Sequence, residues 1–229
     1  RKHPELLKLD RLGESESGLG IHLLKITDSS VEDRFKQVVL VTSLHGGPER
    51  SGTTTALHFV EWLLGDSEEA RETRRNQVLL IMPINHPEAF FRTDRFMNKA
   101  GIDPYTGGGP QHWDLNNLKY KSSDKAPEVK AVLEVVDAWK PDVHADLHGT
   151  GLQEYPLENL GDRTRYQGQI MFEVTGSAYS NYALRPWDWR VTEAMIKAGE
   201  EVGFPSDRFE ADGQRSFHGP VMNPISDRT

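Results

Sequence analysis

The strongest constraint on the fold is a pair of short, nearly all-apolar runs separated by a helical pattern. The runs Gln37–Ser43 and Gln77–Pro83 are rich in Val, Leu and Ile, as is typical of strands buried on both faces. Between them, Ser51–Gly65 carries apolar residues at helical spacing, and its last glycine ends the pattern. This order predicts a β-α-β unit and therefore a mostly parallel sheet.

Other segments extend the alternation of strands and helices. We expect further strands at Gly20–Thr27, Asp142–Leu147 and Gln169–Val174, and further helices at Ala126–Trp139 and Trp189–Val202. The polar stretch Asn85–Ser123 is predicted to be irregular, and loops of that length are usually functional or disordered. Because the chain shows no internal repeat and no composition break, residues 1–229 are interpreted as one domain.

Composition limits the kinds of site that the chain can hold. Lys and Arg number 27 against 35 Asp and Glu, and the net charge of −8 argues against a nucleic-acid partner, which normally needs a basic face. Cysteine is absent, so disulfides, thiolate metal sites and cysteine nucleophiles are excluded. With nine histidines present, a transition-metal site would use imidazole and carboxylate ligands. No window approaches the roughly 18 apolar residues of a membrane span.

Histidines follow two of the predicted strands at the ends where open α/β sheets bind ligands. His45 and Glu49 come after the first buried run, and His144 and His148 lie in and just after Asp142–Leu147. Two imidazoles and a carboxylate form a zinc set that leaves a fourth position open for water. The alternative is that each histidine is a hydrogen-bonded structural residue, which is the commoner role of a lone histidine at a strand end.

These motifs, in this order, resemble the zinc carboxypeptidase family along the whole chain. His3–Ile26 is similar to the family's N-terminal helix end and first strand, and His45–Glu49 with Arg50–Gly52 to its first zinc motif. Four later segments resemble, in order, the family's Asn-Pro-Asp-Gly, Asp-Leu-Asn-Arg and Ser-Glu-Pro-Glu motifs and the strand that carries its third ligand: Asn85–Glu88, Asp114–Asn117, Ala126–Val132 and Pro141–Gly149. The resemblance implies an α/β fold with a mixed, mostly parallel twisted sheet and helices on both faces.

The resemblance also implies a ligand set. Zinc would be held by His45, Glu49 and His148, with His144 as a rival for the third place. Asp146 is a candidate to orient a ligand imidazole through its other ring nitrogen; a salt bridge or a solvated strand end is the alternative. Glu49 would stand at the entrance to the following helix, where the helix dipole favours a carboxylate.

Two departures from the family pattern concern the ligands and the substrate. Three residues, rather than two, separate His45 from Glu49, and a Gly-Pro bulge can absorb the extra one. The family's Asn-Arg pair, which grips the substrate carboxylate, reads Asn116-Asn117, and an amide cannot replace the bidentate fork of arginine. Nearby cations could substitute: Arg92, Arg95, Lys99, Lys119 and Lys121. Arg95, with Arg92 next, also matches best the family arginine that stabilises the oxyanion.

The third departure concerns the general base, which in the family is a glutamate on a late strand. No such glutamate is identified in this chain, since Glu173 comes too early and none follows Glu210. Either the sequence ends before that strand or the protein has lost the base, and the loop-like tail Asn223–Thr229 favours the first of these. The start at Arg1 rather than Met also indicates a trimmed piece, and the N-terminal residues have no apolar segment of the kind found in signal peptides.

The expected function is zinc-dependent hydrolysis of a peptide or amide bond, as in a metallocarboxypeptidase. A zinc deacylase of N-acyl amino acids, related to aspartoacylase and succinylglutamate desuccinylase, or a cell-wall peptide amidohydrolase is the alternative that Asn117 favours. A binding module without activity is the alternative that the missing base favours. Family habit points to a secreted or periplasmic location.

Overall fold

The computed structural model describes most of the first 147 residues and a few later positions. The described residues are 3–44, 46–47, 49–91, 97–102, 125–147, 194, 197–198, 201–202, 210–211 and 214–215. Two compact units divide the chain, residues 1–149 with 228–229 and residues 150–227. In the second unit, β6 (Glu210–Ala211) and β7 (Gln214–Arg215) form a short antiparallel pair. The assignment of residues 1–229 to one domain stays a prediction.

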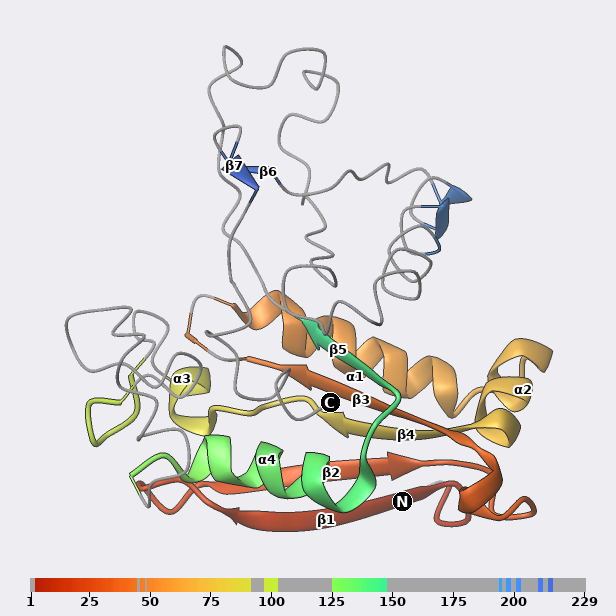
Figure 1. The fold of residues 1–229 in the computed structure, drawn as a ribbon, viewed down its shortest axis with the longest axis horizontal. Coiled ribbons are helices and arrows are strands. Elements are labelled where there is room, and N and C mark those ends of the chain that lie inside the picture. The colour runs from red at the N-terminus through yellow and green to blue at the C-terminus, as the bar shows by residue number, and fades with distance from the viewer. Residues whose placement is uncertain are drawn as a thin grey trace. The chain divides into compact units, whose positions relative to one another are not determined.

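A mixed five-stranded sheet forms the centre of the first unit (Figure 1). Its strand order is β1-β2-β4-β3-β5, in which β4 (Gln77–Met82), β3 (Gln37–Ser43) and β5 (Val143–Leu147) run parallel to one another. The antiparallel part consists of β1 (Leu7–Glu14) and β2 (Gly20–Ile26), which joins β4. The mixed sheet, its three parallel strands and the strand at Gly20–Thr27 were all predicted from sequence, and these predictions are confirmed.

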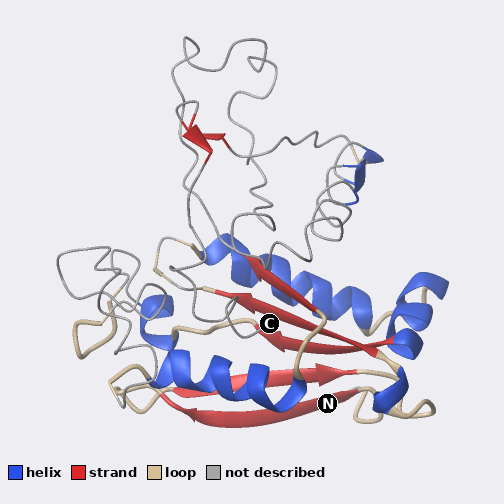
Figure 2. Cartoon of the chain, viewed as in Figure 1, coloured by secondary structure: helices blue, strands red, loops and turns tan. Residues whose placement is uncertain are grey.

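Helix α1 (Arg50–Leu63) covers one face of the parallel strands (Figure 2). Its Ala56 and Leu63 are fully buried in one apolar cluster with Val41 of β3 and Ile81 of β4. The cluster explains the apolar spacing seen in the sequence, since those residues recur on a single side of the helix.

The opposite face of the sheet packs against α4 (Pro127–Trp139), whose Val129, Val132 and Val136 are buried. Lys25 of β2 lies over the Trp139 ring, with its ammonium 4.8 Å from the ring centroid. The sheet is therefore buried on both sides. Because successive strand residues point to opposite faces, this explains the nearly continuous apolar runs in the sequence.

In the first unit, two α-helices and one β-strand differ from the elements predicted from sequence. The helix α2 (Glu68–Asn76) has almost no apolar residues, so periodicity does not reveal it; Ser67 caps it by accepting a hydrogen bond from Ala70 N (3.1 Å). A short helix, α3 (Pro87–Phe91), interrupts the stretch predicted as irregular. The segment likened to a helix end and one strand holds a turn followed by β1 and β2.

Two predicted elements concern the later part of the chain. The strand at Gln169–Val174 lies outside the described residues. Of the helix at Trp189–Val202, the described residues Ala194, Lys197, Ala198 and Glu201 are helical. None of the helices in the described part of the chain is both long enough and apolar enough to cross a membrane.

A buried carboxyl group stands at the start of α4. Glu128 is 1% exposed, and its Oε1 has no hydrogen-bond partner among the described residues. Its Oε2 accepts a bond from Asn98 Nδ2 (3.3 Å). Burial raises the pKa of Glu128 to about 7, and the neighbouring carboxylates of Glu88 and Glu16 add to the rise. The neutral acid is therefore the form that the fold prefers.

This preference predicts a pH dependence of stability. The folded-state pKa of Glu128 is about 7 and lies above the ordinary value of 4.5. The contribution of its protonated form to the unfolding free energy is therefore full below about pH 4.5 and is lost as the pH rises to 7. Glu128→Gln removes the titration, so its unfolding free energy should gain about 3 kcal/mol on the wild type between pH 4.5 and 7. Urea unfolding at several pH values measures this. The exposed Glu134→Gln on the same helix is the control and should follow the wild type; identical slopes for all three proteins would contradict the prediction.

Candidate functional site

The carboxyl ends of the three parallel strands meet at one edge of the sheet. Beyond β3, Leu44 is fully buried and has a φ of 61°, a conformation that non-glycine residues rarely adopt. Two backbone hydrogen bonds hold this turn: Asn85 N donates to Ser43 O (2.9 Å) and His86 N to Leu44 O (3.1 Å). Strained residues of this kind cluster at functional sites, and this one stands directly before His45.

A tight turn follows between β3 and α1. Glu49 N donates to Gly46 O (3.0 Å), and Glu49 is the residue that precedes the first turn of α1. The predicted place of Glu49 at the helix entrance is confirmed. The turn also contains the additional residue between His45 and Glu49, so that residue lengthens a loop and leaves both flanking elements in place.

The first turn of α1 presses against the end of β5. A Cβ atom built on Gly52 would lie 2.3 Å from Leu147 O and 3.3 Å from the Ser43 Cβ. Only glycine allows an approach that close. The helix that begins after Glu49 therefore contacts both the strand that leads to His45 and the strand that leads to His148.

Hydroxyl groups tie α1 and β3 to the end of β4. Pro83 O, just after β4, accepts hydrogen bonds from Ser43 Oγ (2.8 Å) and from Thr53 Oγ1 of α1 (2.8 Å). The Arg50 guanidinium donates to Phe90 O and lies 5.3 Å from the Phe90 ring centroid, which links α1 to α3. These contacts therefore fix the edge of the sheet from which the connecting loops leave.

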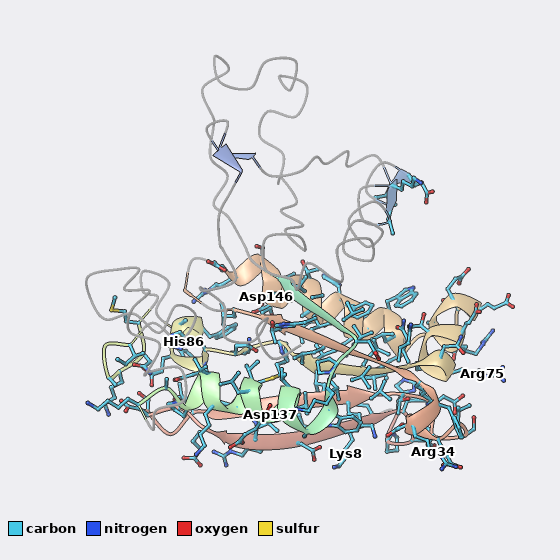
Figure 3. The ribbon with its side chains drawn as sticks, viewed as in Figure 1. Lys8, Arg34, Arg75, His86, Asp137 and Asp146 are labelled. Atoms are coloured by element: carbon cyan, nitrogen blue, oxygen red, sulfur yellow. The ribbon has the colours of Figure 1, made fainter. Side chains whose placement is uncertain are left out.

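Polar side chains also bridge β3 and β5 on the face opposite α1. Thr42 Oγ1 donates to Asp146 Oδ1 (2.5 Å) and lies 2.8 Å from His144 Nε2. In Figure 3, Asp146 lies on β5 at the edge described above, and His86 lies beside α3. Asn85 and His86 are both buried, and neither Asn85 side-chain atom has a hydrogen-bond partner among the described residues.

The predicted site residues divide into two groups. Glu49 is described and half-buried, and His144 and Asp146 lie on β5. Eight residues with predicted roles lie outside the described residues: His45, His148, Arg92, Arg95, Asn116, Asn117, Lys119 and Lys121. Among the residues that are described, no three His, Asp or Glu side chains gather as a metal site.

Two contributors to the site were missed from sequence. In the sequence Gly52 is only part of a motif, whereas in the structure it brings α1 close to the backbone of β5. Thr42 belongs to a run that the sequence identifies only as apolar. The signal that could have singled it out is its hydroxyl group, because a polar side chain inside a buried strand needs a partner.

The chain belongs to the zinc carboxypeptidase family, whose sequence model matches residues 1–167. The resemblance based on six motifs is confirmed by this match. No match was found among curated proteins.

Solved structures share the fold at low sequence identity. A Shewanella denitrificans OS-217 protein with a provisional carboxypeptidase A assignment aligns with a TM-score of 0.69 at 16% identity, over 99% of this chain and 52% of its own. A Pseudomonas aeruginosa metallo-carboxypeptidase gives 0.61 at 16%, over 95% and 50%. One from Burkholderia cenocepacia gives 0.53 at 19%, over 71% and 44%. The chain therefore spans about half the length of these proteins, and the predicted fold class is confirmed.

The contact between Gly52 and β5 makes a testable prediction. Gly52→Ala should lower the unfolding free energy by about 3 kcal/mol, because the new methyl group meets a backbone carbonyl that cannot rotate away. Alanine is intrinsically the better helix residue by about 1 kcal/mol, so any loss must come from this contact. Chemical denaturation measures the change.

Gly13→Ala is the matched control, because no heavy atom lies within 4 Å of its added Cβ. We expect it to cost less than about 1 kcal/mol. A Gly52→Ala protein as stable as the wild type would show that α1 does not need this close approach.

Proposed function

We propose that the chain is the zinc-binding part of a hydrolase that cleaves peptide or amide bonds, and specifically of a metallocarboxypeptidase. Family membership supplies the chemical class. The observation that carries the proposal is the close approach of Gly52 to Leu147 O and Ser43. It draws together the three chain segments that lead to the proposed ligands His45, Glu49 and His148.

These residues suit zinc as a donor set. Two neutral imidazoles and a carboxylate are nitrogen and oxygen ligands that zinc binds at catalytic sites, and they leave a position for water. When bound, zinc would polarise a carbonyl group and lower the pKa of its water. His144 fits the third place less well, because its Nε2 lies at hydrogen-bonding distance from Thr42 Oγ1.

The chain's own cations and amides would handle the substrate. Arg95 is proposed to stabilise the charge that develops on the scissile carbonyl oxygen, and Arg92, Asn116 and Asn117 to bind the substrate beside it. An arginine aimed at the oxyanion acts only as charge develops, which lowers the barrier rather than merely tightening binding. The general base stays unassigned among the residues of this chain. A secreted or periplasmic location is part of the same proposal.

A second candidate function follows from one residue. Asn117 stands where the family has an arginine that grips the substrate's terminal carboxylate. A neutral amide offers no charged bidentate contact, so the substrate could be an acylated amino acid or a cell-wall peptide instead. This candidate keeps the same metal ligands.

Zinc content is the first test. The wild-type chain should bind one zinc ion per molecule, and His45→Ala, Glu49→Ala and His148→Ala should each lose it in metal analysis after dialysis. His58→Ala is the control, since His58 is an exposed residue of α1 that pairs with Glu61 at 3.5 Å. Retention of zinc by all three ligand variants would reject the proposed centre.

Substrate class is the second test. A metallocarboxypeptidase should release the last residue from a peptide with a free C-terminus and leave the amidated peptide intact, because the charged carboxylate supplies binding energy. Mass spectrometry of paired peptides, with the longest natural form of the protein that contains this chain, gives the answer. Equal cleavage of both peptides would favour the second candidate, and zinc binding without cleavage of either would favour a binding module.

A further inference from the structure

A threonine hydroxyl lies inside the core of the sheet, next to the proposed metal centre. Thr42 is fully buried in β3, in a run whose other members are mostly apolar. Burying a hydroxyl costs free energy unless it is hydrogen-bonded. Thr42 is bonded twice, to Asp146 Oδ1 (2.5 Å) and to His144 Nε2 (2.8 Å).

The number of protons on these groups fixes the direction of each bond. A hydroxyl carries one proton, and the Asp146 carboxylate can only accept, so Thr42 donates to Asp146. The Thr42 oxygen must then accept from His144, whose Nε2 therefore carries a proton. A protonated ring nitrogen cannot ligate a metal, so this arrangement assigns Nε2 of His144 to holding Thr42.

The bridge joins the two strands that lead to the proposed ligand histidines. In the parallel ladder Thr42 stands opposite Asp146, and the two residues are 104 positions apart in the sequence. Thr42 precedes His45 by three residues, and Asp146 precedes His148 by two. On the other face of the same strand ends, α1 packs through Gly52 against Leu147 O. The strand ends are thus held from both faces.

We propose that Thr42 is a positioning residue of the metal centre: its hydroxyl bridge to Asp146 and His144 fixes the end of β5 that leads to His148. This inference rests on the proposed zinc site. Groups that orient metal ligands without touching the metal typically change metal affinity 10- to 100-fold when they are removed. Thr42 acts one step further away, through the carboxylate that it holds.

The test measures zinc affinity by competition with a chromogenic chelator, and it needs no substrate. Thr42→Val keeps the shape and removes the hydroxyl; we expect zinc affinity to fall about 10-fold. Thr42→Ser restores the hydroxyl and should recover affinity to within about threefold of the wild type. A Thr42→Val protein that binds zinc as tightly as the wild type would overturn the proposal.

A matched control separates positioning from general stability. Thr27 is also a buried threonine, and its hydroxyl donates to Gln77 O (3.0 Å) at the opposite end of β4. Thr27→Val should lower the midpoint of urea unfolding but leave zinc affinity unchanged. Equal losses of zinc affinity in Thr27→Val and Thr42→Val would show that only stability had been tested, and the proposal would fail.

A double-mutant cycle tests the path through Asp146 and stays informative if Thr42→Val folds poorly. Asp146→Asn keeps the side-chain volume and should itself weaken zinc binding, and Thr42→Ser/Asp146→Asn should be no weaker than Asp146→Asn alone. The double variant Thr42→Val/Asp146→Asn should bind zinc less than threefold more weakly than Asp146→Asn alone, because the two substitutions break the same hydrogen-bonded bridge. Full additivity would overturn the proposal. A wild-type chain that binds no zinc would instead overturn the proposed function, together with the inference that rests on it.

Discussion

The parallel pairing of β3 with both β4 and β5 is the constraint on which the rest of the described structure depends. It makes β3 the interior strand of the parallel part, so both of its faces must be apolar, and it requires a crossover between β3 and β4. Helix α1 provides that crossover. Because parallel strands end at the same edge, the pairing also gathers there the residues that follow all three strands. Contacts between individual residues then have only to stabilise the edge of the sheet, because the strand pairing has already set its position.

This edge is stabilised by short, specific contacts rather than by the burial of apolar side chains. On one face a glycine lets α1 touch the Leu147 carbonyl, and on the other the Thr42 hydroxyl holds Asp146. The Pro83 carbonyl, which accepts hydrogen bonds from two hydroxyl groups, ties the end of β4 to β3 and to α1. Such contacts tolerate little displacement, whereas an apolar cluster can repack. A site whose ligands come from loops gains its geometry from a rigid support of this kind.

The elements predicted correctly are those whose buried residues form a recognisable apolar pattern in the sequence. Strands β3 and β4 are short, nearly continuous apolar runs, and helices α1 and α4 bury apolar residues at a period of 3.6. Their predicted ends therefore lie within about two residues of the observed ends. Helix α2 buries only Ala70 and Arg74 and is specified by its cap and by acidic and basic ends, which periodicity ignores. The candidate ligands were chosen from chemistry near strand ends. The roles of Gly52 and Thr42 could not be predicted in this way. They depend on the register between β3 and β5, which are about a hundred residues apart in the sequence.

The spacing between His45 and Glu49 shows why a motif is better interpreted through backbone geometry than through residue counts. One additional residue would shift a ligand by several ångströms if the segment were extended. Here Leu44 adopts a positive φ and bends the chain as β3 ends, and the bond from Glu49 N to Gly46 O closes a turn just before α1. The turn takes up the additional length, while Gly52 sets where α1 begins relative to β5. The helix start is therefore fixed by its contact with the sheet, so a departure from the family spacing leaves the proposed ligand segments together.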